Sequence, residues 1–166
     1  MATAYALDVS EAHPDAAVRV HNKAFYELMV PIHKGWATEM SQEVAYLGIQ
    51  VHGGMGFVEE TGAAQYYRDA RITTIYEGTT AIQANDLVGR KMAREGGVTA
   101  KALIVSMREF AVELAKSQHP HLKATHTRLV SGIDAVERTV DFNLANFDSN
   151  VRACFAGSVP MVKLFG

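Results

Sequence analysis

The amino-acid sequence predicts an all-α protein, in which a helical bundle is followed by a helical hairpin. Apolar residues recur at steps of three or four through each long segment, which is the period of an amphipathic helix. No run alternates apolar and polar residues for long enough to indicate a sheet. There are only four prolines and no low-complexity tracts, so folded structure is expected nearly from end to end.

The first long helix is expected to begin after His13-Pro14-Asp15. Pro31 should kink this helix rather than end it, because the apolar stripe keeps its phase beyond the proline. The stripe consists of Phe25, Leu28, Ile32, Trp36, Met40, Val44 and Leu47.

A hairpin of two antiparallel helices is predicted after Gly96-Gly97, because two stripes of helical period flank His119-Pro120. The stripes are Leu103, Met107, Phe110 and Leu114, and then Leu129, Ile133, Val136, Val140, Leu144 and Phe147. Asp148 or Ser149 is expected to cap one more helix, which carries Cys154 on an apolar face. We divide the chain into residues 1–95 and 96–166.

Composition excludes several classes of function. Sixteen Lys and Arg against eighteen Asp and Glu give a net charge of -2, which provides no cationic field for nucleic acid. No stretch approaches the ~18 apolar residues that span a membrane. The single cysteine is typical of a reducing compartment, so a cytoplasmic protein is expected. No metal site is expected, because the histidines lack the spacing of a carboxylate-bridged metal bundle and are interpreted as solvated helix-end residues.

A glycine-rich segment follows the first long helix, with the sequence Gln50-Val51-His52-Gly53-Gly54-Met55-Gly56-Phe57. Glycines at a helix end permit positive φ and close approach of another backbone or of a ligand. An ordinary helix stop and turn is the alternative interpretation.

Glu77 precedes a further helix, whose N-cap is expected at Thr79 or Thr80. One interpretation is an ordinary acidic residue favoured by the helix dipole. The other is a general base held in a Tyr-Glu-Gly turn. The dipole and burial would shift its pKa in opposite directions, so the residues alone leave both interpretations open.

Three motifs in one order resemble the C-terminal helical domain of acyl-CoA dehydrogenases. They are Gln50-x-x-Gly53-Gly54-x-Gly56-Phe57, Arg68-Asp69-Ala70-Arg71-Ile72 and Ile75-Tyr76-Glu77-Gly78-Thr79. Residues 96–166 resemble the extra C-terminal module of the subgroup that includes 3-methylmercaptopropionyl-CoA dehydrogenases. Members of the family carry further domains ahead of this region, so we expect the chain to be an internal fragment.

The resemblance implies an FAD-dependent enzyme of fatty acid metabolism that converts an acyl-CoA to the trans-2-enoyl-CoA. Glu77 would remove the α-proton and its backbone amide would bind the thioester carbonyl. Tyr76 and Gly78 would border the substrate. The residues that would contact FAD are Gln50, Val51, His52, Gly53, Gly54, Thr79 and Thr80.

The resemblance also implies partners: an electron-transfer flavoprotein or similar acceptor, and further copies of the chain in a dimer or tetramer. The alternative is a non-catalytic helical oligomerisation module when the chain is isolated from the flavin-binding domains. We expect the isolated chain to self-associate through uncovered faces bearing Phe25, Leu28, Trp36 and Met40, and to hold FAD weakly.

Overall fold

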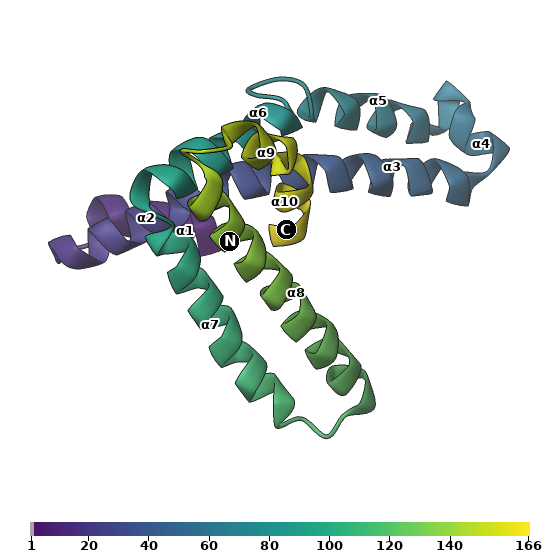
Figure 1. Cartoon of the computed structure of the whole chain (residues 1–166). Coiled ribbons are helices and arrows are strands. Elements are labelled where there is room, and N and C mark those ends of the chain that lie inside the picture. Colours follow the sequence, from purple (N-terminus) through teal and green to yellow (C-terminus); the bar gives the residue numbers. More distant parts are fainter. Residues whose placement is uncertain (1) are drawn as a thin grey trace.

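The computed structural model describes residues 2–166, and within them it confirms the all-α class, with no strand. Its α-helices, drawn in Figure 1, are α1 (Ala2–Ala12), α2 (Ala16–Ile32), α3 (Thr38–His52), α4 (Gly54–Phe57), α5 (Ala63–Thr73), α6 (Thr80–Asp86), α7 (Val98–Ala115), α8 (Pro120–Asn146), α9 (Val151–Ala156) and α10 (Ser158–Phe165). Short π-helical segments, His33–Ala37 and Leu87–Met92, and 3-10 turns, Glu59–Thr61 and Ala93–Glu95, continue or connect them.

Helix α1 packs against α2 and was missed by the sequence analysis. Its buried residue is Ala6, whereas the larger Tyr5 and Leu7 are exposed. A buried position filled by one alanine gives a weak signal, because alanine contributes little to the contrast between the two faces of a helix.

The first long helix begins where the sequence predicts, since the side chain of Asp15 accepts a hydrogen bond from the backbone N–H of Ala17 at 2.8 Å. Pro31 does not end it: α2 passes through the π-helical segment His33–Ala37 directly into α3. A proline cannot donate to the preceding turn, and a π-helical turn accommodates such a local irregularity. The helix is therefore continuous to His52.

The predicted apolar stripe of this helix is only partly buried. Leu28 and Ile32 lie in the core, but Val44 and Leu47 are exposed. The reason is that α3 leaves the bundle and packs mainly against α5, forming an arm that projects from the molecule with α4 at its far end (Figure 1). Two helices cannot cover the full width of each other's apolar surface.

The core lies where α2, α6, the segment Leu87–Met92, α8 and α10 meet. Its fully buried large side chains are Leu28, Leu87, Val88, Met92, Val140, Met161 and Val162. Gly35 permits a close approach, because a Cβ there would lie 2.7 Å from Cγ1 of Val162 on α10. Helix α10 thus packs directly on the π-helical turn after Pro31.

Helices α7 and α8 form the predicted antiparallel hairpin, which projects away from the arm (Figure 1). The stripe of α8 is confirmed, but that of α7 is wrong at Phe110, which is 61% exposed. The buried positions of α7 are Ala100, Ile104 and Ala111. Small alanines let the two helices approach closely, and they do not stand out in a pattern of large apolar residues.

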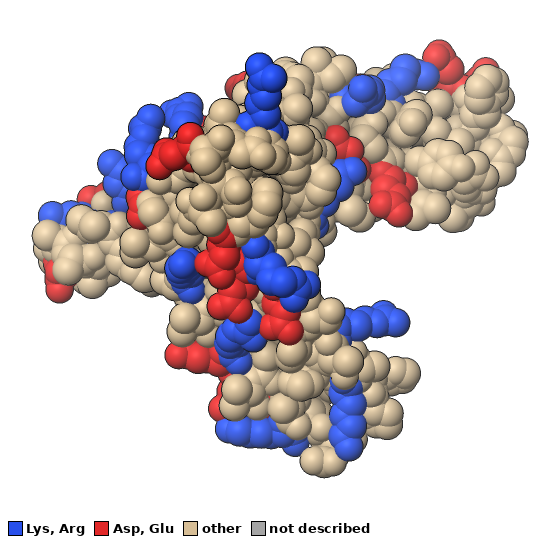
Figure 2. All heavy atoms as spheres, in the orientation of Figure 1, with Lys and Arg blue, Asp and Glu red and all other residues tan. Residues whose placement is uncertain are grey.

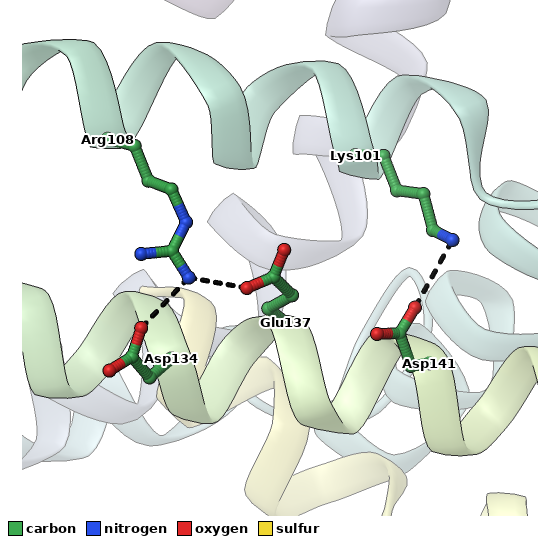
Figure 3. Close-up of polar contacts among 5 residues, drawn as sticks. All are labelled: Lys101, Arg108, Asp134, Glu137 and Asp141. Atoms are coloured by element: carbon green, nitrogen blue, oxygen red, sulfur yellow. Dashed lines mark hydrogen bonds and ion pairs between the residues drawn. The ribbon is translucent and has the colours of Figure 1, made fainter.

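Ion pairs link α7 and α8 along one side of the hairpin (Figure 3). Arg108 pairs with Asp134 at 2.8 Å and with Glu137, and Lys101 pairs with Asp141 at 3.2 Å. The carboxylates of Glu137 and Asp134 raise the pKa of the Arg108 guanidinium above its usual value. Figure 2 shows acidic and basic side chains side by side over this part of the surface.

The cap of α9 is Asn150, whose side chain accepts from the N–H of Ala153 at 3.3 Å, so the predicted caps Asp148 and Ser149 are wrong. Cys154 is buried as expected. Serine and aspartate are common caps, but the turn after α8 continues to Asn150, whose φ of -145° and ψ of 57° are not helical and make it the residue next to the first turn of α9. The division of the chain into residues 1–95 and 96–166 stays a prediction.

Candidate functional site

The segment between α5 and α6 forms a tight turn around Glu77. The backbone N–H groups of Ile75 and Tyr76 both donate to the carbonyl of Ile72, at 2.9 and 3.1 Å. Glu77 then has φ 52° and Gly78 φ 91°, two consecutive left-handed residues. Thr79 is extended and caps α6, because its hydroxyl accepts from the N–H of Ile82 at 3.4 Å. The cap expected at Thr79 or Thr80 is thus Thr79.

Glu77 is the one residue other than glycine with positive φ in the described part of the chain. Its side chain is exposed, and among residues 2–166 its carboxylate has no hydrogen bond or ion pair. Its backbone N–H makes no described hydrogen bond either. A left-handed L-residue is strained, and such strain gathers at functional sites. The turn therefore presents a carboxylate and an amide that are both free to bind.

Residues from other helices hold this turn in place. The ammonium of Lys34 donates to the carbonyl of Thr73 and lies 5.0 Å from the centroid of the Tyr76 ring. The hydroxyl of Thr80 donates to a carboxylate oxygen of Glu39 at 2.6 Å. The side-chain amide of Gln83 donates to the Glu77 carbonyl at 3.0 Å. None of these three contacts to the turn was predicted from the sequence.

The three residues that hold the turn differ in how well the sequence could have predicted them. Lys34 and Glu39 lie about forty residues before the turn, with separations of 39 and 41 to their partners, so no local pattern marks them. Gln83 lies on the helix that follows the turn, six residues after Glu77. Its contact with the turn could have been predicted from the sequence, because a glutamine side chain is long enough to span that separation.

The glycine-rich segment forms the end of α3 and the start of α4. Gly53 has φ 59° and ψ -140°, and its N–H donates to the carbonyl of Gln50 at 3.1 Å. A Cβ at Gly53 or Gly54 would meet nothing within 4 Å, so the backbone there is open to close approach. Gly56 is different, because its Cβ would lie 2.3 Å from the Ile49 carbonyl oxygen. Gly56 is needed for packing, and the preceding two leave backbone accessible.

Gln50, Val51 and His52 occupy the last turn of α3 and are exposed. The amide of Gln50 donates to the Tyr46 hydroxyl at 3.2 Å, and His52 Nδ1 lies 2.8 Å from the Gly48 carbonyl.

The predicted site residues fall into two groups. Tyr76, Gly78, Thr79 and Thr80 surround Glu77, whereas residues 50–54 lie at the opposite end of the arm (Figure 1). Helix α5 separates the two groups with eleven residues, or about 16 Å at the usual helical rise. Within one chain the two groups therefore do not line one small pocket.

Within residues 2–166, no group of three or more His, Cys, Asp or Glu has the arrangement of a metal site. None of the described helices has the length and apolar content needed to cross a membrane.

Comparison with known proteins identifies the family. The family described as "Acyl-CoA dehydrogenase, C-terminal domain" matches residues 2–92, more than half of the chain. The chain belongs to the acyl-CoA dehydrogenase family. The match includes the glycine-rich segment and the turn around Glu77, so both groups of predicted site residues lie in the family domain.

Individual acyl-CoA dehydrogenases show how far the likeness extends. The chain is 46% identical over all 166 residues to 3-methylmercaptopropionyl-CoA dehydrogenase of Ruegeria pomeroyi, and spans 28% of that protein's length. It is 29% identical over 141 residues to butyryl-CoA dehydrogenase of Syntrophomonas wolfei, of which it spans 23%. Short-chain specific acyl-CoA dehydrogenase of Rattus norvegicus matches over 74 residues at 43% identity, or 45% of this chain and 18% of the relative. Of these three, only the first matches the chain over its whole length.

Proposed function

We propose that this chain supplies the catalytic base and part of the flavin site of an FAD-dependent acyl-CoA dehydrogenase. The reaction is α,β-dehydrogenation of an acyl-CoA thioester to the trans-2-enoyl-CoA, within fatty acid metabolism. The observation that carries the proposal is the left-handed turn at Glu77 in a chain of this family, where neither the carboxylate nor the N–H of Glu77 has a hydrogen-bond partner among residues 2–166.

Glu77 has two tasks in this reaction. Its carboxylate takes the α-proton, which is only weakly acidic and becomes easier to remove when the thioester carbonyl is hydrogen-bonded. Its N–H donates to that carbonyl oxygen, where negative charge develops. Gly78 and Tyr76 border the acyl group. Bound FAD would supply the acceptor for the hydride that leaves the β-carbon.

Most of the residues predicted to contact FAD are exposed, so they are accessible to a bound FAD. Gly53 and Gly54 leave their backbone open, and Thr79 lies at the N-terminus of α6, where N–H groups favour an anion such as a pyrophosphate. The distance between the two groups supports FAD contacts from two copies of the chain. Thr80 fits less well, because its hydroxyl already donates to Glu39.

The test compares Glu77→Gln with Glu60→Gln in an enzyme that joins this chain to the flavin-binding domains of the family. Glu60 is exposed on a 3-10 turn and serves as the matched control. Glu77→Gln should retain flavin and lose about 10²–10⁴-fold in the rate of flavin reduction by acyl-CoA. Reduction at the parent rate would show that Glu77 is not the base.

A second candidate is a non-catalytic helical oligomerisation module. It is supported by the large apolar side chains that the arm exposes, with Val51 at 85%, Phe57 at 81% and Tyr66 at 75%. Single apolar residues on a surface are ordinary, but a continuous group of them is typical of an interface. A yellow purified chain with a flavin absorbance band would favour the first candidate, and a colourless one the second.

The partners follow from the same proposal. They are an acyl-CoA substrate, an electron-transfer flavoprotein or similar acceptor, and further copies of the chain in a dimer or tetramer. The buried single cysteine, Cys154, supports a reducing compartment such as the cytoplasm.

A further inference from the structure

We propose that Gln83 is a positioning residue that holds Glu77 in its left-handed conformation. The proposal rests on the function proposed for Glu77, because positioning matters only if the carboxylate and N–H of Glu77 act on a substrate. Gln83 itself would contact neither substrate nor FAD.

Gln83 contacts both ends of the turn. Its side-chain Nε2 donates to the Glu77 carbonyl at 3.0 Å, and its backbone N–H donates to the Thr79 carbonyl at 2.9 Å. Gln83 is half-buried and lies on the first turn of α6, whose backbone is fixed by the Thr79 cap. The helix thus places the amide at a defined position relative to the turn.

Gly78 leaves the space that the Gln83 side chain needs. A Cβ at Gly78 would lie 2.8 Å from Nε2 of Gln83 and 3.5 Å from Cγ2 of Ile82. Gly78 also has φ 91°, which a larger residue rarely adopts. Any side chain at position 78 would therefore push the Gln83 amide away from the Glu77 carbonyl.

The turn needs such a contact because of the backbone of Glu77. An L-residue prefers the right-handed region over the left-handed one by roughly 5- to 30-fold. The φ of Glu77 sets the direction of its N–H relative to the side chain, and ψ sets the direction of its carbonyl. The hydrogen bonds from Ile75 and Tyr76 to Ile72 hold the chain before Glu77, so a hydrogen bond that fixes the carbonyl after it restrains φ and with it the N–H relative to the carboxylate.

The first test measures the conformation of Glu77 in the 166-residue chain. Scalar couplings about the N–Cα bond of Glu77 distinguish positive from negative φ in solution. Gln83→Met keeps the length of the side chain and removes the donor, and it should lower the left-handed population of Glu77 at least twofold. The matched control is Gln65→Met, an exposed glutamine whose amide donates to Asp69 and accepts from Arg68 on its own helix, and it should leave the couplings unchanged.

Unchanged couplings in Gln83→Met would overturn the proposal. If Gln83→Met fails to fold, Gln83→Glu removes the same donor at neutral pH with the same shape, and the same two outcomes apply to it.

The second test measures kcat and KM in an enzyme that contains this chain with the flavin-binding domains. Misplacement of a catalytic group by about 1 Å can cost about 10²-fold, so Gln83→Met should lower kcat about 10- to 100-fold. KM should change by less than about threefold, because Gln83 is not placed against the substrate. An unchanged kcat, or equal losses through KM, would overturn the positioning role.

The two proposals fail separately. If Glu77→Gln retains full activity while Gln83→Met still shifts the couplings, the function of Glu77 is wrong and the contact of Gln83 with the turn stands. If Glu77→Gln is inactive while Gln83→Met changes neither the couplings nor kcat, Glu77 is the base and Gln83 does not position it.

Discussion

One added methyl group at Gly96 or at Gly97 should separate backbone strain from packing at the base of the hairpin. The two glycines have similar left-handed backbones, with φ 65° and 74°. A Cβ at Gly96 would meet nothing within 4 Å, whereas a Cβ at Gly97 would lie 2.7 Å from Cδ1 of Leu144. Alanine at either position adds strain, but only Gly97→Ala adds steric overlap with α8.

The magnitudes follow from these two costs. A left-handed alanine costs roughly 1–2 kcal/mol of unfolding free energy, so Gly96→Ala should lose about that amount. Overpacking adds roughly 1–3 kcal/mol, so Gly97→Ala should lose about 2–5 kcal/mol. For a chain of this size each kcal/mol lowers Tm by about 2–4 °C.

The assay is urea unfolding followed by far-ultraviolet circular dichroism. Both variants should keep the slope of the parent and differ in midpoint. Adding Leu144→Ala to Gly97→Ala should recover most of the overpacking cost, a coupling that a double-mutant cycle measures directly. Equal midpoints for Gly96→Ala and Gly97→Ala would refute the argument, because they would show that α8 yields to the methyl group at no cost.

Three further outcomes are expected. Thr80→Val removes the half-buried hydrogen bond to Glu39 and should lose roughly 1.5–3 kcal/mol in urea unfolding; a loss within error would show that water replaces the hydroxyl. Arg108→Met should destabilise the hairpin slightly at low salt and not at 1 M NaCl. The partners of Arg108 are solvent-exposed, and at 1 M salt the Debye screening length is only about 3 Å, so their attraction is screened. Because the pKa of Arg108 is raised in the folded state, its contribution would be lost only as pH rises above the ordinary arginine pKa, and stability should not depend on it near neutral pH. The isolated chain should self-associate and bind FAD weakly by sedimentation and flavin titration, and Val51→Ser with Phe57→Ser should reduce association; a monomer that binds FAD stoichiometrically would contradict both halves.

The surface expected to drive this association is different in the folded chain. Leu28 is buried in the core, and Phe25, Trp36 and Met40 are half-buried by neighbouring helices. The exposed apolar surface lies instead on the arm, at Val51, Phe57 and Tyr66 among others. The period of an apolar stripe identifies the apolar face of a helix. Only the tertiary packing shows which parts of that face are buried.

Local physics allowed the sequence to predict much of this protein. Helical periodicity predicted the long helix and the hairpin, and the preference of Asp and Thr for N-caps predicted the starts of α2 and α6. Family motifs brought Glu77 and its neighbours to attention, and these residues do occupy one turn. In each case the residues that decide the outcome lie within one or two helical turns of each other.

Contacts between distant segments were decided only by the tertiary structure. Lys34 and Glu39 support the turn around Glu77 across separations of 39 and 41 residues, and Gly35 accommodates Val162 of α10. Alanines proved to be buried in α1, at Ala6, and in α7, at Ala100 and Ala111, because close helix packing favours small residues that a pattern of large apolar side chains does not include. Helix formation depends on neighbours along the chain, whereas burial depends on which other helix packs against a face. The apolar stripe of one helix does not specify that partner.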